Sequence, residues 1–146
     1  MRGRRTIHLS VEADFPSVRL LAAACHGVLA EWGLPESRRS LLELAVVEAA
    51  TNVVRHAYGG RGGRVEVELA RDGREVELSV LDAGLSFDPT RVPAPREPDP
   101  GDPATWPEGG MGLPIIRAAC DELRYRSEDG RNRLTLLLTV DEPASP

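Results

Sequence analysis

The sequence predicts an α+β fold, a two-layer sandwich with about three helices on one face of a five-stranded, mostly antiparallel sheet. Two kinds of pattern predict it. Apolar and polar residues alternate in three segments, as in half-buried strands, and two Asp-Gly steps favour hairpins, one of them between two of these segments and the other between two later ones. Three further segments have apolar residues at helical spacing. Because direct hairpins join antiparallel strands, an all-parallel sheet is excluded.

The first strand and the first helix follow one another near the start of the sequence. Apolar and polar side chains alternate over residues 7–11, which predicts a strand. The helix is expected from Pro16, which a first helical turn tolerates, to Gly33, which is suited to end a helix. Its apolar positions are Val18, Leu21, Ala22, Cys25, Val28, Leu29 and Trp32.

A second helix and a hairpin come next. The helix is expected from about Pro35 to Ala57, with Gly59-Gly60 at its end. Its central part is apolar almost all round, which is typical of a buried helix. The strands of the hairpin cover residues 65–69 and 76–80, with the turn at Asp72-Gly73.

The third helix is expected from roughly Met111 to Glu122. A second hairpin follows, with strands at residues 123–128 and 131–140 and its turn at Asp129-Gly130. Before this helix, residues 88–109 form a connection with seven of the twelve prolines, a density that excludes regular structure. A connection of this length is a lid, a binding loop or an insertion without a role.

The composition narrows the class of protein. The 146 residues fit one domain, and the 18 positive charges, all arginine, against 23 acidic residues give a net charge of −5. Such a balance excludes the basic surface of nucleic-acid-binding proteins. The longest apolar stretches fall far short of a membrane span, and no export signal is expected. Cys25 and Cys120 have apolar neighbours, as reduced thiols of a cytoplasmic protein would.

Three polar groups of residues carry the functional prediction, and the first lies in the second helix. Glu48, Asn52 and His56 have i, i+4, i+8 spacing and therefore share one helix face. A carboxylate among valines and alanines costs several kcal/mol unless it is paired or linked to a metal, so this row predicts a cavity. The structural alternative is a bond from Glu48 to Arg55, or an Asn bond that closes a gap in the core.

The second group follows a strand. Asp82 has the same parity as Val76, Leu78 and Val80, so its carboxylate should face the helix-covered side at the mouth of the sheet, where it could accept an exocyclic amine. The alternative is an Asx turn before Gly84.

The third group, residues 108–116, places glycines at the start of the third helix. Bare backbone amides there form an anion site, although a short glycine run is weak support by itself.

In this order and at these separations, the three groups resemble the N, G1 and G2 boxes of the GHKL superfamily (gyrase, heat-shock chaperone, histidine kinase, MutL). Over residues 5–140 the chain is similar to the bacterial anti-sigma factor serine/threonine kinases, which have the histidine-kinase-like ATPase or Bergerat fold. The residues that match the family motifs are Glu48, Asn52, His56, Ala57 and Tyr58, then Asp82, Gly84, Phe87, Asp88 and Pro89, then Gly110, Gly112 and Leu113.

The resemblance implies roles for these residues. Glu48 would be the general base for the attacking hydroxyl, Asn52 would coordinate Mg²⁺, and His56 would support the helix end or a water. Asp82 would accept a hydrogen bond from the adenine amine of ATP, and Gly84 would allow close packing on the base. The phosphate site would consist of Gly110, Met111, Gly112 and Leu113, and the candidates to neutralise the γ-phosphate are Arg55, Arg91 and Arg96.

The resemblance also implies an activity and partners. The protein would be an anti-sigma factor that uses Mg-ATP to phosphorylate a serine or threonine of an anti-sigma factor antagonist, with residues 88–109 as the ATP lid. A sigma factor and a second copy of the chain are the other expected partners. Two alternatives remain: a non-catalytic nucleotide-binding module that sequesters a sigma factor or another regulator, and a small-molecule sensor that binds no nucleotide.

Overall fold

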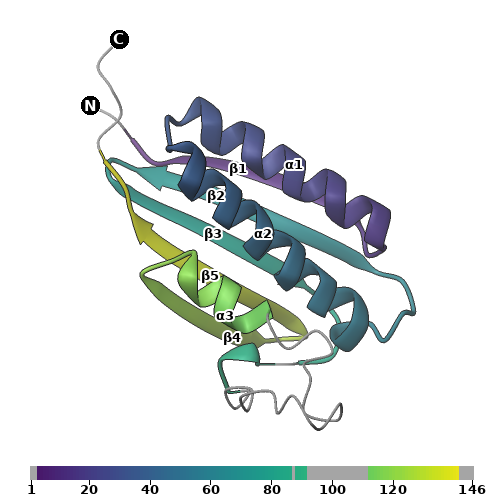
Figure 1. The fold of residues 1–146 in the computed structure, drawn as a ribbon. Coiled ribbons are helices and arrows are strands. Elements are labelled where there is room, and N and C mark those ends of the chain that lie inside the picture. The colour runs from purple at the N-terminus through teal and green to yellow at the C-terminus, as the bar shows by residue number, and fades with distance from the viewer. Residues whose placement is uncertain (1–2, 87, 92–111, 142–146) are drawn as a thin grey trace, which may run out of the picture.

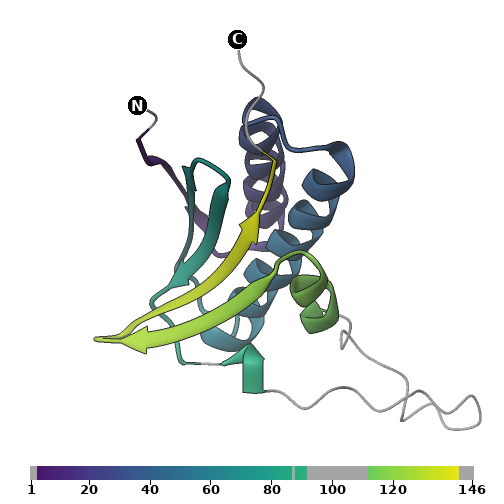
Figure 2. The same ribbon diagram turned by 90° about the vertical axis from the view of Figure 1, so that its left-hand side faces the viewer.

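The computed structural model describes residues 3–86, 88–91 and 112–141, and these residues form a two-layer α+β sandwich. One layer is a five-stranded sheet. Helices pack on one of its faces (Figures 1 and 2). The strands are β1 (Arg5–Glu12), β2 (Arg64–Asp72), β3 (Glu75–Asp82), β4 (Glu122–Glu128) and β5 (Arg131–Thr139). The predicted fold class and order of elements are therefore confirmed.

The strand order in the sheet is β1-β2-β3-β5-β4, and all four pairings are antiparallel. The second hairpin turns at Asp129 and Gly130, which have φ of 51° and 75°, as a two-residue type I′ turn requires. In the first hairpin Asp72 pairs with Glu75, so the turn lies at Gly73-Arg74, one residue later than predicted. The positive φ of Gly73 (59°) fits this position, because glycine adopts it without steric cost.

Helix α1 (Phe15–Glu31) begins and ends where local chemistry allows. The Asp14 side chain accepts a hydrogen bond from Ser17 N (2.8 Å), which caps the first turn. The capping bond lowers the pKa of Asp14. Gly33 follows the helix with a φ of 79°. The predicted apolar face is confirmed, since Val18, Leu21, Ala22, Cys25 and Leu29 are all buried.

The predicted second helix is divided in two. Helix α2 (Glu36–Asn52) is followed by η1 (Val53–Ala57), a turn of π-helix in which Tyr58 N donates to Val53 O (3.0 Å). The prediction of a single regular helix was therefore wrong, because its apolar residues are compatible with either winding. The expectation of a helix buried all round was also wrong: α2 packs on α1, α3 and β3, but Leu44 lies outside these contacts and is 52% exposed.

Two other boundaries differ from the prediction. Helix α3 (Gly112–Ala118) ends at Ala118 and not at Glu122, because Asp121 N donates to Leu137 O (2.9 Å) and β4 begins at Glu122. At the start of the proline-rich connection, Pro89–Arg91 forms a short 3-10 helix, η2, which the density of prolines did not predict. Asp88 stabilises it by accepting from the backbone N–H of Thr90 (2.8 Å).

The core lies between the layers and includes the apolar side chains of α1, α2, β2, β3 and β5 that face inward. Buried Arg71 closes one end of it with bonds to the carbonyls of Gly73 (3.0 Å), Asp141 (2.9 Å) and Trp32. None of the helices described here has the length and apolar character needed to cross a bilayer.

Candidate functional site

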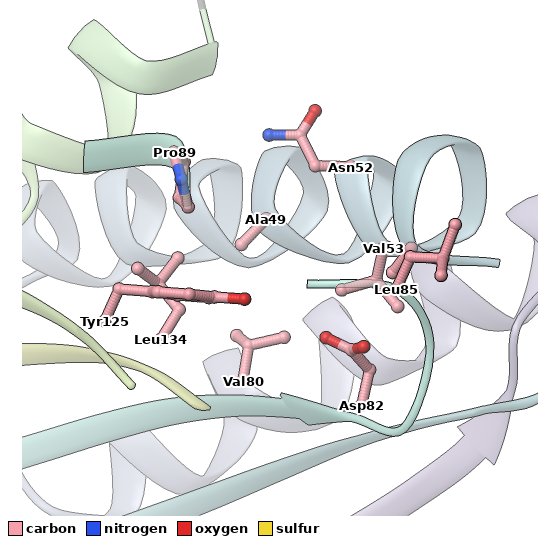
Figure 3. Close-up of a pocket in the computed structure, with 10 residues that line it drawn as sticks. Ala49, Asn52, Val53, Val80, Asp82, Leu85, Pro89, Tyr125 and Leu134 are labelled. Carbon is pink, nitrogen blue, oxygen red and sulfur yellow. The ribbon is translucent and has the colours of Figure 1, made fainter. Parts of the chain in front are cut away.

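A pocket opens between the helix layer and the sheet at the ends of α2 and β3, under η2 (Figure 3). Val80, Leu134 and Tyr125 line it on the strand side, and the helix side comes from α2 and η1. Its enclosed volume is about 30 Å³, and the space including its open mouth is about 380 Å³. A purine base therefore requires lining side chains to move outward, and Leu85 is the one that is exposed (75%) among the described lining residues. The complete described lining is Ala49, Asn52, Val53, Ala57, Val80, Asp82, Leu85, Pro89, Tyr125 and Leu134.

Asp82 lies at the strand-side edge of this pocket, where the alternation of β3 predicted it (Figure 3). Its Oδ1 accepts two hydrogen bonds, from Gly84 N (2.9 Å) and from Asn132 Nδ2 (2.7 Å). Among the described residues, no hydrogen bond to its Oδ2 is present. The Asx turn and the pocket carboxylate, which were alternatives on the sequence, therefore coexist in one residue.

Gly84 holds the loop after β3 against the end of η1. A Cβ at this position would lie 2.4 Å from Ala57 O and 2.6 Å from Ala57 C, and Leu85 N donates to the same oxygen (2.7 Å). The backbone contact leaves no room for a side chain, so the glycine is needed for the close approach of these two segments. Ala57 belongs to the π turn, and both segments line the pocket.

Asn132 is the buried polar residue of the site that the sequence did not reveal. Besides Asp82, its Nδ2 donates to Gly84 O (3.0 Å) and Leu85 O (3.4 Å), and its Oδ1 accepts from Ser127 Oγ (2.7 Å). Asn132 lies directly opposite Asp82 in the pairing of β3 with β5. The role of Asn132 is visible only from this pairing, which brings together two residues 50 positions apart. The Asp-Gly steps in the sequence, in contrast, predict pairing only between strands that follow one another along the chain.

Tyr58, which matched the N-box motif without an assigned role, supports the same loop from the other side. Its hydroxyl donates to Arg64 O (2.8 Å) and accepts from Ala83 N (2.9 Å). Gly63 makes this arrangement possible, because a Cβ there would lie 2.4 Å from the Tyr58 ring.

The row Glu48, Asn52 and His56 does not line the pocket as a unit. Asn52 is in the lining, at the junction of α2 with η1, and projects from the helix layer (Figure 3). His56 lies within the π turn, which changes the angle per residue, and its side chain is exposed. Neither Glu48 nor His56 is in the described lining. Of this row, only Asn52 is therefore in the described lining of the pocket, and the roles of Glu48 and His56 stay predictions.

Glu48 instead lies beside the start of α3. A Cβ on Gly112 would be 2.8 Å from Glu48 Oε2, so the half-buried carboxylate packs directly on this glycine. The fold thus brings a residue of the first polar group against one of the third, 64 positions away. Leu113 is half-buried in the first turn of α3, whereas Gly110 and Met111 fall outside the described residues.

Of the three arginines proposed to neutralise the γ-phosphate, two lie within the described residues. The Arg55 guanidinium stacks over the ring of Phe15, 5.6 Å from its centroid, and Arg55 is absent from the described pocket lining. Arg91 ends η2, and Arg96 lies outside the described residues, as does the connection from residue 92 to residue 111.

Comparison with known proteins agrees with this arrangement. Residues 11–138 match the family model of the histidine kinase-like ATPase domain. The chain is 36% identical over 102 residues to the serine/threonine-protein kinase BtrW of Bordetella bronchiseptica, covering 67% of this chain and 68% of the relative. It is 27% identical over 135 residues to the serine-protein kinase RsbW of Bacillus cereus, covering 91% and 82% of the two chains.

A solved structure has the same fold. The chain aligns with the crystal structure of the RsbU and RsbW domains of a Mycobacterium tuberculosis protein, with a TM-score of 0.67 and 24% identity. The match covers 96% of this chain and about a third (34%) of the solved one. The chain therefore belongs to the histidine kinase-like ATPase family, in the group of bacterial anti-sigma factor serine/threonine kinases.

Proposed function

We propose that this protein is an anti-sigma factor that binds Mg-ATP and transfers the γ-phosphate to a serine or threonine of an anti-sigma factor antagonist. The observation that carries the proposal is the position of Asp82, a carboxylate with one oxygen held by two donors at the edge of a mostly apolar pocket. A site of this kind suits a flat base with an exocyclic amine, because an ionised carboxylate only accepts hydrogen bonds and most of the lining side chains are apolar.

The chemistry of the side chains fits a nucleotide. Val80, Leu134 and Ala49 offer apolar contacts to a base. Gly84 N and Asn132 Nδ2 both donate to Asp82 Oδ1, so the carboxylate is oriented before the ligand arrives. Asn52 would offer an amide oxygen to Mg²⁺, an ion that usually takes its other ligands from waters and phosphates. Bound Mg-ATP would supply the phosphoryl group and neutralise charge during its transfer.

Glu48 would accept the proton of the attacking hydroxyl. Its carboxylate lies against Gly112, at the start of the helix where the proposed phosphate-binding residues Gly110 to Leu113 are gathered in the sequence. A general base at this place would lie next to the transferred phosphoryl group and away from the adenine. His56, which is exposed, would support the end of the helix.

The test is transfer of radiolabelled γ-phosphate from ATP to purified antagonist proteins encoded near the gene, with wild type and Glu48→Gln compared. Gln keeps the size of Glu48 and its contact with Gly112 but removes its basicity. We expect transfer to fall roughly 10²- to 10⁴-fold while the affinity for ATP changes little.

Asn52→Ala is the matched comparison on the same helix, and it should lose Mg²⁺-dependent affinity for ATP as well as transfer. A wild-type protein that binds Mg-ATP and its partner but labels none of the antagonists would support a non-catalytic, nucleotide-binding regulator instead. Calorimetry that detects no binding of Mg-ATP or Mg-ADP at millimolar concentration would contradict both readings.

A further inference from the structure

We propose that Asn132 is a positioning residue that determines the preference of the pocket for bases with an exocyclic amine. It would do so by holding Asp82 in one orientation, with Oδ1 occupied and Oδ2 left for the ligand. This inference rests on the proposed function, because it takes Asp82 as the acceptor of the adenine amine.

The hydrogen bonds around Asn132 fix its own orientation first. Its amide group faces three acceptors, Asp82 Oδ1 (2.7 Å), Gly84 O (3.0 Å) and Leu85 O (3.4 Å), so the nitrogen must point toward them. Rotation by 180° would place the amide oxygen against these acceptors. Ser127 Oγ donates to Asn132 Oδ1 (2.7 Å) and stabilises the same orientation from the other side.

The sheet then fixes the position of this amide relative to Asp82. Asn132 pairs with Asp82 across β3 and β5, and with Ser127 across β5 and β4. The three side chains therefore form a row across neighbouring strands, Ser127 to Asn132 to Asp82. Asn132 is 2% exposed, so water does not readily replace a lost bond.

Consequently Asp82 Oδ1 is committed to the protein. Gly84 N and Asn132 Nδ2 are both donors to it, and the remaining oxygen of the carboxylate is the one that a ligand amine can reach. Without Asn132, Oδ1 keeps a single donor, Gly84 N, and the carboxylate is free to rotate about the bond that joins it to the side chain. The effect would fall on recognition of the amine and leave the apolar contacts to the base unchanged.

The experiment measures binding of two probes by calorimetry in the presence of Mg²⁺: ATP, and purine riboside triphosphate, which lacks the exocyclic amine. The variant is Asn132→Leu, which has similar volume and no polar group. We expect wild type to prefer ATP roughly ten- to hundredfold. In the variant this ratio should fall close to one, and the affinity for purine riboside triphosphate should stay within about threefold of wild type.

Two further variants separate the causes. In an Asp82→Asn background, Asn132→Leu should not change the ratio any further, because the positioned carboxylate is already gone. Thr135→Val is the matched control: it removes the bond between Thr135 Oγ1 and Ser79 Oγ (3.0 Å), which joins the same two strands on the opposite face of the sheet. This control should keep the wild-type ratio.

Each outcome decides between the claims. An unchanged ratio in Asp82→Asn overturns the assignment of Asp82 and with it the proposed base pocket. Loss of the ratio in Asp82→Asn but not in Asn132→Leu overturns only the role of Asn132. If Asn132→Leu weakens the binding of ATP and of purine riboside triphosphate equally, the positioning role of Asn132 is also overturned, because loss of a purely structural residue would affect both nucleotides alike. If Asn132→Leu does not fold, Ser127→Ala decides: the ratio should fall at least threefold, and a ratio equal to that of wild type contradicts the proposal.

Discussion

Gly84 links the backbone of two segments that are distant in the sequence. It lies where the loop after β3 touches the π turn, and a side chain there would collide with the carbonyl of Ala57. The same carbonyl accepts from Leu85 N. The shape of the pocket mouth thus depends on the absence of one Cβ atom.

Gly84→Ala should lower the free energy of unfolding by about 1–3 kcal/mol, because the loop or η1 must shift to admit the methyl group. It should weaken binding of ATP as well, since both segments line the pocket. Urea unfolding and calorimetry measure the two effects.

Gly27→Ala is the control for replacing a glycine by alanine where the added methyl group meets no neighbour. Gly27 lies in α1, and a Cβ there would meet nothing within 4 Å. Alanine should stabilise this helix by about 0.5–1 kcal/mol. Equal unfolding free energies of Gly84→Ala and wild type would contradict the close contact with Ala57.

The sequence was sufficient to predict the position of Asp82 but not its partner. The alternation of Val76, Leu78 and Val80 set the face on which its carboxylate lies, and the pocket is on that face. Asn132 is different, because its importance depends on β5 lying next to β3. That pairing is a property of the whole sheet, and nothing in the residues near Asn132 specifies it.

At the scale of elements, helix ends differ from the prediction where tertiary bonds compete with periodicity. The second helix changes to a π turn where Ala57 O meets the loop after β3, and α3 ends where Asp121 N joins β5. In both cases the apolar pattern continues past the actual boundary. Periodicity therefore predicted the existence and order of the elements better than their ends.

Arg71 connects three parts of the fold whose proximity the sequence does not predict. Its guanidinium donates to carbonyls at the end of α1, in the β2–β3 turn and after β5. An arginine on a strand is normally expected to be solvated, whereas this one is 7% exposed. Its planar group with several donors suits three acceptors that lie in different directions.

Arg71→Lys should lower the free energy of unfolding by roughly 2–3 kcal/mol, because one ammonium group cannot reach all three carbonyls and buried acceptors lose their donors. Arg124→Lys is the matched control on the same sheet, since the Arg124–Glu122 pair is exposed on both sides. It should leave the urea midpoint unchanged. Equal midpoints for both variants would show that Arg71 does not lock these elements.

At the scale of the whole molecule, the two-layer core shields a thiol. Burial raises the pKa of Cys25 to about 12, and it also raises the pKa of the less buried Cys120. The folded protein therefore keeps the Cys25 proton at a pH where the unfolded chain, with a thiol pKa near 9, releases it. This contribution to stability is complete below pH 9 and is lost as pH rises toward 12.

The free energy of unfolding should consequently decrease from pH 9 to pH 12 more steeply in wild type than in Cys25→Ala, by the release of one proton. Urea unfolding at several pH values in this range measures the difference. Identical slopes would mean that Cys25 ionises as easily in the folded protein as in the unfolded chain. In the native protein at pH 8, a thiol reagent should leave Cys25 unmodified.

The central claim is that the pocket at the end of β3 holds the adenine of ATP, and the most direct measurement is a crystal structure with Mg²⁺ and a non-hydrolysable ATP analogue. We predict the exocyclic amine within hydrogen-bonding distance of Asp82 Oδ2, the phosphates on the side of Asn52 and Glu48, and the exposed Leu85 side chain displaced outward. An analogue bound at another surface, or in this pocket with its amine directed away from Asp82, would contradict the claim.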